Sequence, residues 1–272
     1  MDNLTAIIYG IIQGMMEFLP VSSSGHLALI PHVMKLKDPG VFFDLTMHLG
    51  TGFSVLVYFR KEIGQILKDF FYFSIFKWDK LSAKNFLMKN MLISTIATFF
   101  MVLFLKRVDF EWLRSPKVIG LNLLFFGIVM YLADKFGRNL NMEQGSHRME
   151  KSLEKEKSFW IGIFQAIAIF PGVSRAGATL TISRFMGLSR VEASNYTFML
   201  SLPIIFGGFI IKLRELPSNN NVDWVAAIIG GVVGFVVGLL TIKFFLQFIQ
   251  RMGLGYFALY RALLAGLLFF YF

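Results

Sequence analysis

Long stretches without charge dominate this chain. Five of them consist mostly of Leu, Ile, Val, Phe and Met, at residues 45–59, 90–105, 118–133, 193–211 and 224–242. A sixth stretch, residues 252–272, is interrupted only by Arg261. A helix that crosses a bilayer needs about 20 residues. Each stretch therefore predicts a transmembrane helix once its polar flanks are included.

The composition excludes several classes of protein. Of the 272 residues, 56% are apolar and only 16% are charged, whereas a soluble domain has about 25% charged residues. This excludes a soluble enzyme and a nucleic-acid-binding protein. The net charge of +10 is interpreted as anchoring of cytoplasmic loops. Cysteine is absent and there are four histidines, which excludes disulfides, thiol nucleophiles and cysteine metal sites.

Two further apolar stretches, residues 3–16 and 158–170, are too short to cross a bilayer. The first stops before Glu17 and the second before Pro171, and each leads into a Ser/Gly-rich turn. Such broken segments are tolerated at membrane depth only inside protein or against a cavity. The predicted fold is therefore an all-α polytopic membrane protein with six transmembrane helices and two re-entrant helix pairs.

The two turns resemble each other. Residues 13–27 and 165–179 align at an offset of 152, and five of the 15 positions are identical. Three predicted crossings lie between them, so the two copies are expected to be inverted. Broken helices in inverted halves point to a site near the bilayer midplane. The predicted halves are about 1–137 and 158–272, joined by a cytoplasmic loop at 138–157.

The distribution of basic residues predicts the orientation. If the first turn enters from outside, the inside loops hold 17 Lys and Arg residues and the outside segments hold 8. Basic residues accumulate in cytoplasmic loops. Both ends of the chain are therefore expected outside.

The side chains of the turns suit an anionic ligand. Gln13 and Glu17 share a helical face, and helix N-termini attract anions. The forked guanidinium of Arg175 suits phosphate oxygens. Asp44 and His48 lie four residues apart, and a structural hydrogen bond is favoured over a functional role for this pair. Hydroxyl groups in the turns can donate to phosphate or cap helices, at Ser22, Ser23, Ser174 and Thr179.

At these residues the chain resembles a known family. Residues 17–26 (EFLPVSSSGH) and 171–179 (PGVSRAGAT) are similar to the two signatures of undecaprenyl-diphosphate phosphatase of the bacitracin-resistance type. The segments 43–51 and 190–193 and the final Tyr260-Arg261 are also similar to family segments.

The resemblance implies a multi-pass hydrolase of the bacterial inner membrane whose site faces the periplasm. It would convert undecaprenyl diphosphate to undecaprenyl phosphate and inorganic phosphate, recycling the carrier for cell-wall synthesis and conferring bacitracin resistance. The implied partners are a polyprenyl diphosphate lipid and the bilayer, without nucleic acid, and a homodimer is left open. A divalent cation, Mg²⁺ or Ca²⁺, is expected. The alternative is a transporter that flips polyprenyl phosphate, because inverted repeats with broken helices are also a transporter architecture.

The resemblance also assigns roles to residues of the turns. The nucleophile is left open between serine, histidine and water, and the general base between His26 and Glu17. The chain departs from the family pattern at Gln13, where an acid is common, and at Ala176, where a second serine is common. The expected catalytic residues are Glu17, His26, Arg175, Ser23 and Ser174, the substrate-binding residues are Ser22, Ser24, Gly25, Gly172 and Thr179, and the metal ligands are Glu17 and Gln13.

Overall fold

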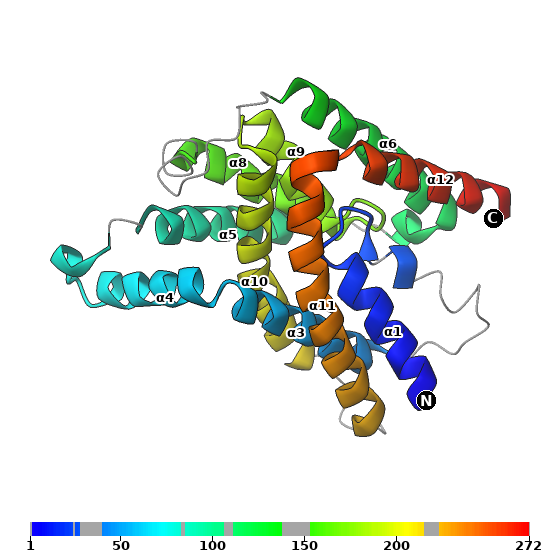
Figure 1. Ribbon diagram of the computed structural model, residues 1–272, viewed down its shortest axis with the longest axis horizontal. Coiled ribbons are helices and arrows are strands. Elements are labelled where there is room, and N and C mark those ends of the chain that lie inside the picture. Colours follow the sequence, from blue (N-terminus) through cyan, green and yellow to red (C-terminus); the bar gives the residue numbers. More distant parts are fainter. Residues whose placement is uncertain are drawn as a thin grey trace.

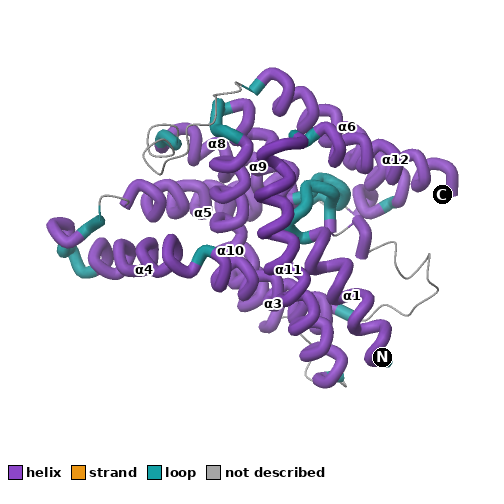
Figure 2. Tube along the Cα trace, in the orientation of Figure 1, coloured by secondary structure: helices purple, strands orange, loops and turns teal. Residues whose placement is uncertain are grey.

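The computed structural model describes residues 2–23, 25–27, 40–82, 85–105, 111–137, 153–214 and 223–271. Within these ranges all regular secondary structure is helical (Figures 1 and 2). The α-helices are α1 (Asn3–Met16), α3 (Val41–Tyr58), α4 (Arg60–Ser74), α5 (Asn85–Leu105), α6 (Pro116–Phe136), α8 (Lys155–Ala166), α9 (Arg175–Phe185), α10 (Arg190–Arg214), α11 (Trp224–Met252) and α12 (Gly255–Tyr271). Three short 3₁₀ helices are η1 (Trp78–Lys80), η2 (Glu111–Arg114) and η3 (Ile167–Ile169).

Five of the described helices are long and apolar enough to cross a membrane, namely α3, α5, α6, α10 and α11. Apart from Phe59, they contain all of the first five uncharged stretches, which fits a polytopic membrane protein. Helix α12, in the sixth stretch, has 17 residues, and α1 has 14. Of the two short helices before the turns, α1 has the bounds of the stretch 3–16. Helix α8 begins before residue 158 and ends before residue 170, and η3 follows it.

Helix α11 packs against both α1 and α3 (Figure 1), and glycines allow the close approach. A Cβ atom added to Gly50 of α3 would lie 2.1 Å from the carbonyl oxygen of Gly231. One added to Gly10 of α1 would lie 2.7 Å from the oxygen of Gly230. Small residues at helix contacts are the usual means by which membrane helices approach closely. The spacing of α1, α3 and α11 therefore depends on these glycines.

The remaining helices form neighbouring pairs around this group. Helix α5 packs on α8, α6 on α12, and α9 contacts α6, α8 and α10. Phe18, in the first turn, packs edge-on against Phe198 of α10 with ring centroids 5.4 Å apart, and Phe198 contacts Phe245 of α11 at 5.5 Å. All three rings are buried. The first turn is thus held in the main hydrophobic core.

A buried carboxylate joins four segments of the chain. Asp134 of α6 accepts hydrogen bonds from Arg184 of α9 (3.2 Å) and Arg190 of α10 (2.8 Å). It also accepts from the backbone N–H of Leu254 at 2.9 Å, in the connection to α12. Removing one partner of a buried charge cluster leaves an uncompensated charge. This cluster therefore ties α6, α9, α10 and α12 together.

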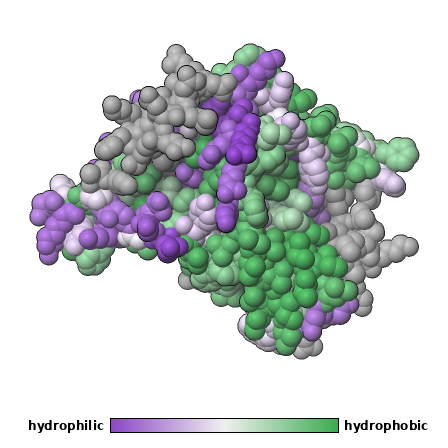
Figure 3. Space-filling view, in the orientation of Figure 1, coloured by the Kyte–Doolittle hydropathy of each residue, from purple (hydrophilic) through white to green (hydrophobic). Residues whose placement is uncertain are grey.

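Residues 60–89 are one of the inside loops in which the basic residues were counted, but the first half of this segment is helix α4. The apolar side chains Ile63 and Leu67 lie about one turn apart on this helix, and the basic residues Lys61 and Lys68 lie two turns apart, so α4 is amphipathic. In Figure 3 the arm that contains α4 is hydrophilic, whereas a continuous hydrophobic face covers the region of α1, α3 and α11. Periodicity of 3.6 residues, rather than hydropathy alone, would have predicted this helix.

Replacement of Gly50 by alanine is expected to separate α3 from α11. The added methyl group meets a backbone oxygen that cannot rotate away, and overpacking typically costs about 1–3 kcal/mol. The midpoint temperature of unfolding in detergent should fall. The matched control is Gly207→Ala in α10, where an added Cβ has no atom within 4 Å. Equal midpoints for the two variants would contradict the close contact.

Candidate active site

The two turns lie together in the middle of the molecule, where the loops cluster in Figure 2. In each turn one serine has a left-handed backbone conformation, with φ of 74° at Ser22 and 72° at Ser174. These two serines are the aligned pair of the 152-residue offset. Such a conformation disfavours side chains with a Cβ atom by about 1–2 kcal/mol. Its occurrence at both aligned positions indicates that the turns share one local structure.

The two serines also make the same hydrogen bond. Ser22 Oγ accepts from the backbone N–H of Gly25 at 3.4 Å, and Ser174 Oγ accepts from that of Gly177 at 3.1 Å. Each bond caps the helical segment that follows its turn. Gly25 and Gly177 are themselves an aligned pair. Ser174 is therefore the N-cap residue of α9.

A buried arginine of α12 holds both turns. The Arg261 guanidinium donates to the carbonyl oxygens of Pro20 in the first turn, at 3.2 Å, and of Gly172 and Val173 in the second, at 2.9 and 3.0 Å. It also donates to Leu123 O of α6 at 3.0 Å, and its side chain is fully buried. Breaks in membrane helices leave carbonyl groups that need partners. Arg261 supplies them for both turns at once.

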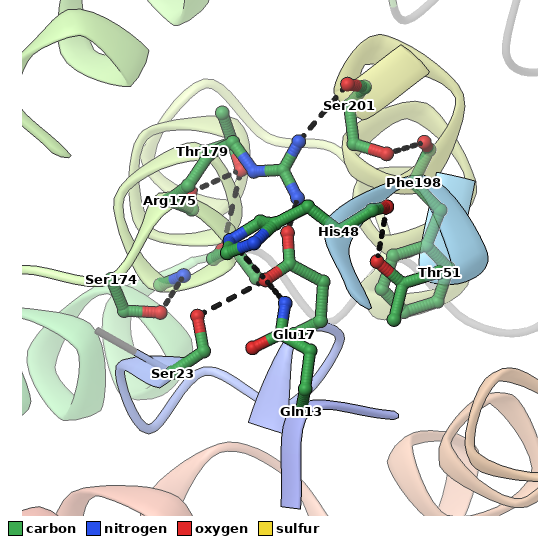
Figure 4. Close-up of polar contacts among 12 residues, drawn as sticks. Gln13, Glu17, Ser23, His48, Thr51, Ser174, Arg175, Thr179, Phe198 and Ser201 are labelled. Carbon is green, nitrogen blue, oxygen red and sulfur yellow. Dashed lines mark hydrogen bonds and ion pairs between the residues drawn. The ribbon is translucent and has the colours of Figure 1, made fainter. Parts of the chain in front are cut away.

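Glu17 is the centre of the polar side chains in Figure 4. Its Oε1 atom accepts a hydrogen bond from Nη2 of Arg175, 158 residues away in the chain. Its Oε2 atom accepts from Gln13 Nε2 at 2.9 Å and from Ser23 Oγ at 3.0 Å. The carboxylate side chain is only 5% exposed. The first turn therefore contributes an acid and a hydroxyl, and the second contributes a cation.

Arg175 is placed to contact an anion as well as Glu17. Its Nη1 atom donates to the carbonyl oxygen of Ser201 in α10 at 3.0 Å, as seen in Figure 4. A guanidinium carries five N–H groups, and the bonds to Glu17 and Ser201 engage two of them. Arg175 is also the first residue of α9, whose N-terminus carries a partial positive charge. This end of the site suits phosphate oxygens.

Some expected site residues point elsewhere. His26 has Nδ1 2.8 Å from Ser22 O and Nε2 2.6 Å from the hydroxyl of Tyr260, on whose ring it stacks. Thr179 Oγ1 donates to the backbone oxygen of Arg175 at 2.8 Å. Gly172 contributes a left-handed turn and a carbonyl group to Arg261. Ser24 and residues 138–152 of the predicted cytoplasmic loop lie outside the described residues.

Two contacts of the site could not be predicted from the sequence. Nε2 of His48 lies 3.7 Å from Glu17 Oε2, although only a structural hydrogen bond was expected of that residue. Arg261 is one of the positions at which the sequence is similar to the family, but the sequence alone indicates no role for it. Its position could have indicated one, because a single charged residue in an apolar stretch is costly unless it has buried partners.

The donor atoms around Glu17 fit a hard divalent cation. Such ions bind carboxylate, amide, hydroxyl and water oxygens. Glu17 and Ser23 supply two kinds, and Gln13 Oε1, in a fully buried side chain, has no hydrogen-bond partner among the described residues. No group of three or more His, Asp or Glu side chains suited to a metal occurs in the described ranges. A cation bound at Glu17 would therefore need neutral ligands beside this carboxylate.

Comparisons with known proteins agree along almost the whole chain. The sequence model of the family described as "Bacitracin resistance protein BacA" matches residues 6–267. An undecaprenyl-diphosphatase of Marinobacter nauticus is 36% identical, with 99% of this chain and 98% of the relative covered. That of Moorella thermoacetica is 37% identical, with 98% and 97% covered. "Undecaprenyl-diphosphatase 2" of Stutzerimonas stutzeri is 35% identical, with 98% and 97% covered.

Arg261→Lys is expected to impair both turns although the charge is kept. An ammonium group has three N–H donors and no planar fork, so carbonyl oxygens of the turns lose partners at a cost of about 1–3 kcal/mol each. The unfolding temperature in detergent should drop clearly. Arg251→Lys, at the exposed end of α11, is the control and should be neutral. Unchanged stability of both variants would show that charge alone is needed at Arg261.

Proposed function

The chain belongs to the bacitracin resistance protein BacA family, and on that premise we propose that it hydrolyses undecaprenyl diphosphate. The products are undecaprenyl phosphate and inorganic phosphate. The reaction recycles the lipid carrier for cell-wall synthesis, and bacitracin resistance follows from the family. The enzyme is a phosphoric anhydride hydrolase of the membrane.

The contact between Glu17 and Arg175 carries this proposal. It brings a carboxylate and a guanidinium from two distant turns into one buried site. Hydrolysis of a diphosphate depends mainly on positioning and on neutralisation of charge. Arg175 and the N-terminus of α9 bind the phosphate oxygens, because both carry positive charge and N–H donors.

Glu17 acts as the base in the proposed reaction. Ser23 Oγ already donates its proton to Glu17 Oε2 at 3.0 Å, which is the arrangement of a nucleophile with its base. Ser23 either attacks the terminal phosphorus and expels undecaprenyl phosphate, which leaves a phosphoserine that water hydrolyses to inorganic phosphate, or it holds a water molecule that attacks the phosphorus directly. Ser174 acts as the helix cap of the second turn, with its Oγ engaged by Gly177.

Gln13 and Glu17 would hold the divalent cation, with Ser23 as a further oxygen ligand. When bound, the cation would neutralise negative charge on the diphosphate and so reduce its repulsion from Glu17. The chain's own residues orient the lipid headgroup and accept the proton.

The proposed placement in the cell follows from the helices and the charges. We propose six spans, with α12 as the sixth, and two inverted re-entrant pairs that begin with α1 and α8. The bias of basic residues toward the loop that contains α4 favours a cytoplasmic position for that loop. The site then opens to the periplasmic side of the inner membrane, and the polyprenyl tail lies among the apolar helices.

Release of phosphate from undecaprenyl diphosphate by the purified protein in detergent tests the function. A flippase needs a sealed bilayer, so turnover in micelles identifies an enzyme. Ser23→Ala should lower turnover by about 10²–10⁴-fold, as expected for loss of a nucleophile or positioned hydroxyl, and Arg175→Lys by about 10²-fold or more. Ser74→Ala, on exposed α4, is the control. Absence of phosphate release from the wild-type protein would refute the proposal.

Labelling of engineered cysteines tests the orientation, and the background is clean because the chain has no cysteine. Lys77→Cys and Asn3→Cys place thiols at exposed positions on opposite sides of the proposed membrane. In intact cells whose outer membrane admits the reagent, a thiol reagent that cannot cross the inner membrane should label only the Asn3→Cys protein. The reverse pattern would invert the proposed orientation.

A further inference from the structure

The His48 side chain reaches from α3 toward the Glu17 carboxylate, which Arg175 also contacts (Figure 4). Its Nε2 atom lies 3.7 Å from Oε2, the oxygen that also accepts from Gln13 and Ser23. The side chain of His48 is 36% exposed, whereas that of Glu17 is 5% exposed. The imidazole therefore stands at the accessible edge of a carboxylate that is otherwise enclosed.

The other ring nitrogen of His48 determines which tautomer is present. Nδ1 lies 2.7 Å from the backbone carbonyl oxygen of Asp44, one helical turn earlier. A carbonyl oxygen only accepts hydrogen bonds, so Nδ1 carries a proton. In the neutral ring Nε2 then has a free lone pair that faces Glu17. Histidines that bind metals have this arrangement, because their second nitrogen donates to a backbone carbonyl or carboxylate.

His26 does not offer the same atom. Its Nδ1 lies against Ser22 O and its Nε2 against the hydroxyl of Tyr260 at 2.6 Å. The ring is stacked on that of Tyr260, with centroids 5.6 Å apart. Both nitrogens therefore have partners away from Glu17.

Gln13 provides an independent observation at the same place. Its side chain is fully buried, and its Oε1 atom has no partner among the described residues, while its Nε2 donates to Glu17 Oε2. Rotation of the amide by 180° exchanges the two atoms and turns an unused oxygen toward the carboxylate. Ser23 Oγ lies on the same oxygen of Glu17. One nitrogen and three kinds of oxygen ligand thus converge.

We propose that His48 Nε2 and Glu17 Oε2 together ligate the divalent cation of this site, with Gln13 and Ser23 as neutral oxygen ligands. Bonds of about 2.1 Å place adjacent ligand atoms about 3 Å apart in an octahedral site. The observed separation of 3.7 Å closes with a small rotation of either side chain. An imidazole ligand makes the site better suited to Mn²⁺ or another transition metal than to Ca²⁺. This inference rests on the proposed site but not on its turnover.

Binding of Mn²⁺ to the full-length protein in detergent tests the proposal. Electron paramagnetic resonance measures the affinity, and spin-echo modulation detects the nitrogen of a coordinated imidazole. The wild-type protein should bind Mn²⁺ with a nitrogen coupling. His48→Gln should lose that coupling. Its affinity for Mn²⁺ should fall about 10-fold or more, because loss of a group that supports a metal site typically has an effect of this size. The matched variant His26→Gln should keep the coupling.

A second variant keeps the test decisive if His48→Gln fails to fold. The chain has four histidines, so replacement of His26, His32 and His147 by glutamine leaves His48 alone. That protein should retain the nitrogen coupling, and growth with ¹⁵N-labelled histidine should change its pattern. Two results would overturn the proposal. One is Mn²⁺ binding without nitrogen coupling in the wild-type protein. The other is a coupling that disappears in His26→Gln but remains in His48→Gln.

Phosphate release measured on the same preparations separates this inference from the proposed function. Nitrogen-coordinated Mn²⁺ in a protein that releases no phosphate would support the metal site and refute the phosphatase activity. Phosphate release by a protein whose bound metal shows no nitrogen coupling would support the phosphatase activity and refute the proposed metal site.

Discussion

The site depends on one buried ion pair, between Glu17 and Arg175. Neither side chain is more than 16% exposed, so each charge would be costly without the other. The pair also links residues 158 positions apart, so it forms only when both turns are in place. The hydroxyl of Ser23, the amide of Gln13 and the N-terminus of α9 are arranged around it. Loss of either charge would therefore affect the scaffold as well as the chemistry.

The membrane explains why so much of this fold could be predicted from the sequence. Lipid requires long apolar helices, so the uncharged stretches coincide with α3, α5, α6, α10 and α11. The short stretches 3–16 and 158–170 predicted short helices that end before the two turns, as α1 and α8 do. The alignment of the turns predicted neither φ nor hydrogen bonds. Even so, Ser22 and Ser174 share both.

The contacts that could not be predicted are those between distant segments. Nothing in local spacing indicates that His48 of α3, rather than His26 beside Ser23, approaches Glu17. That choice depends on how α3 packs on α11 and on the hydroxyl of Tyr260, which engages His26. Helix α4 was missed for a different reason. It is amphipathic and carries charge, and a search for uncharged stretches does not detect such a helix.

The carbonyl contacts of Arg261 have a consequence for the order of assembly. Synthesis proceeds from the N-terminus, so both turns are made well before Arg261 reaches them. Until α12 is inserted, Pro20, Gly172 and Val173 lack the donor that their carbonyl oxygens have in the finished structure. An unsatisfied carbonyl within lipid costs several kcal/mol. The two turns therefore gain these hydrogen bonds late, when α12 docks against the helices made before it.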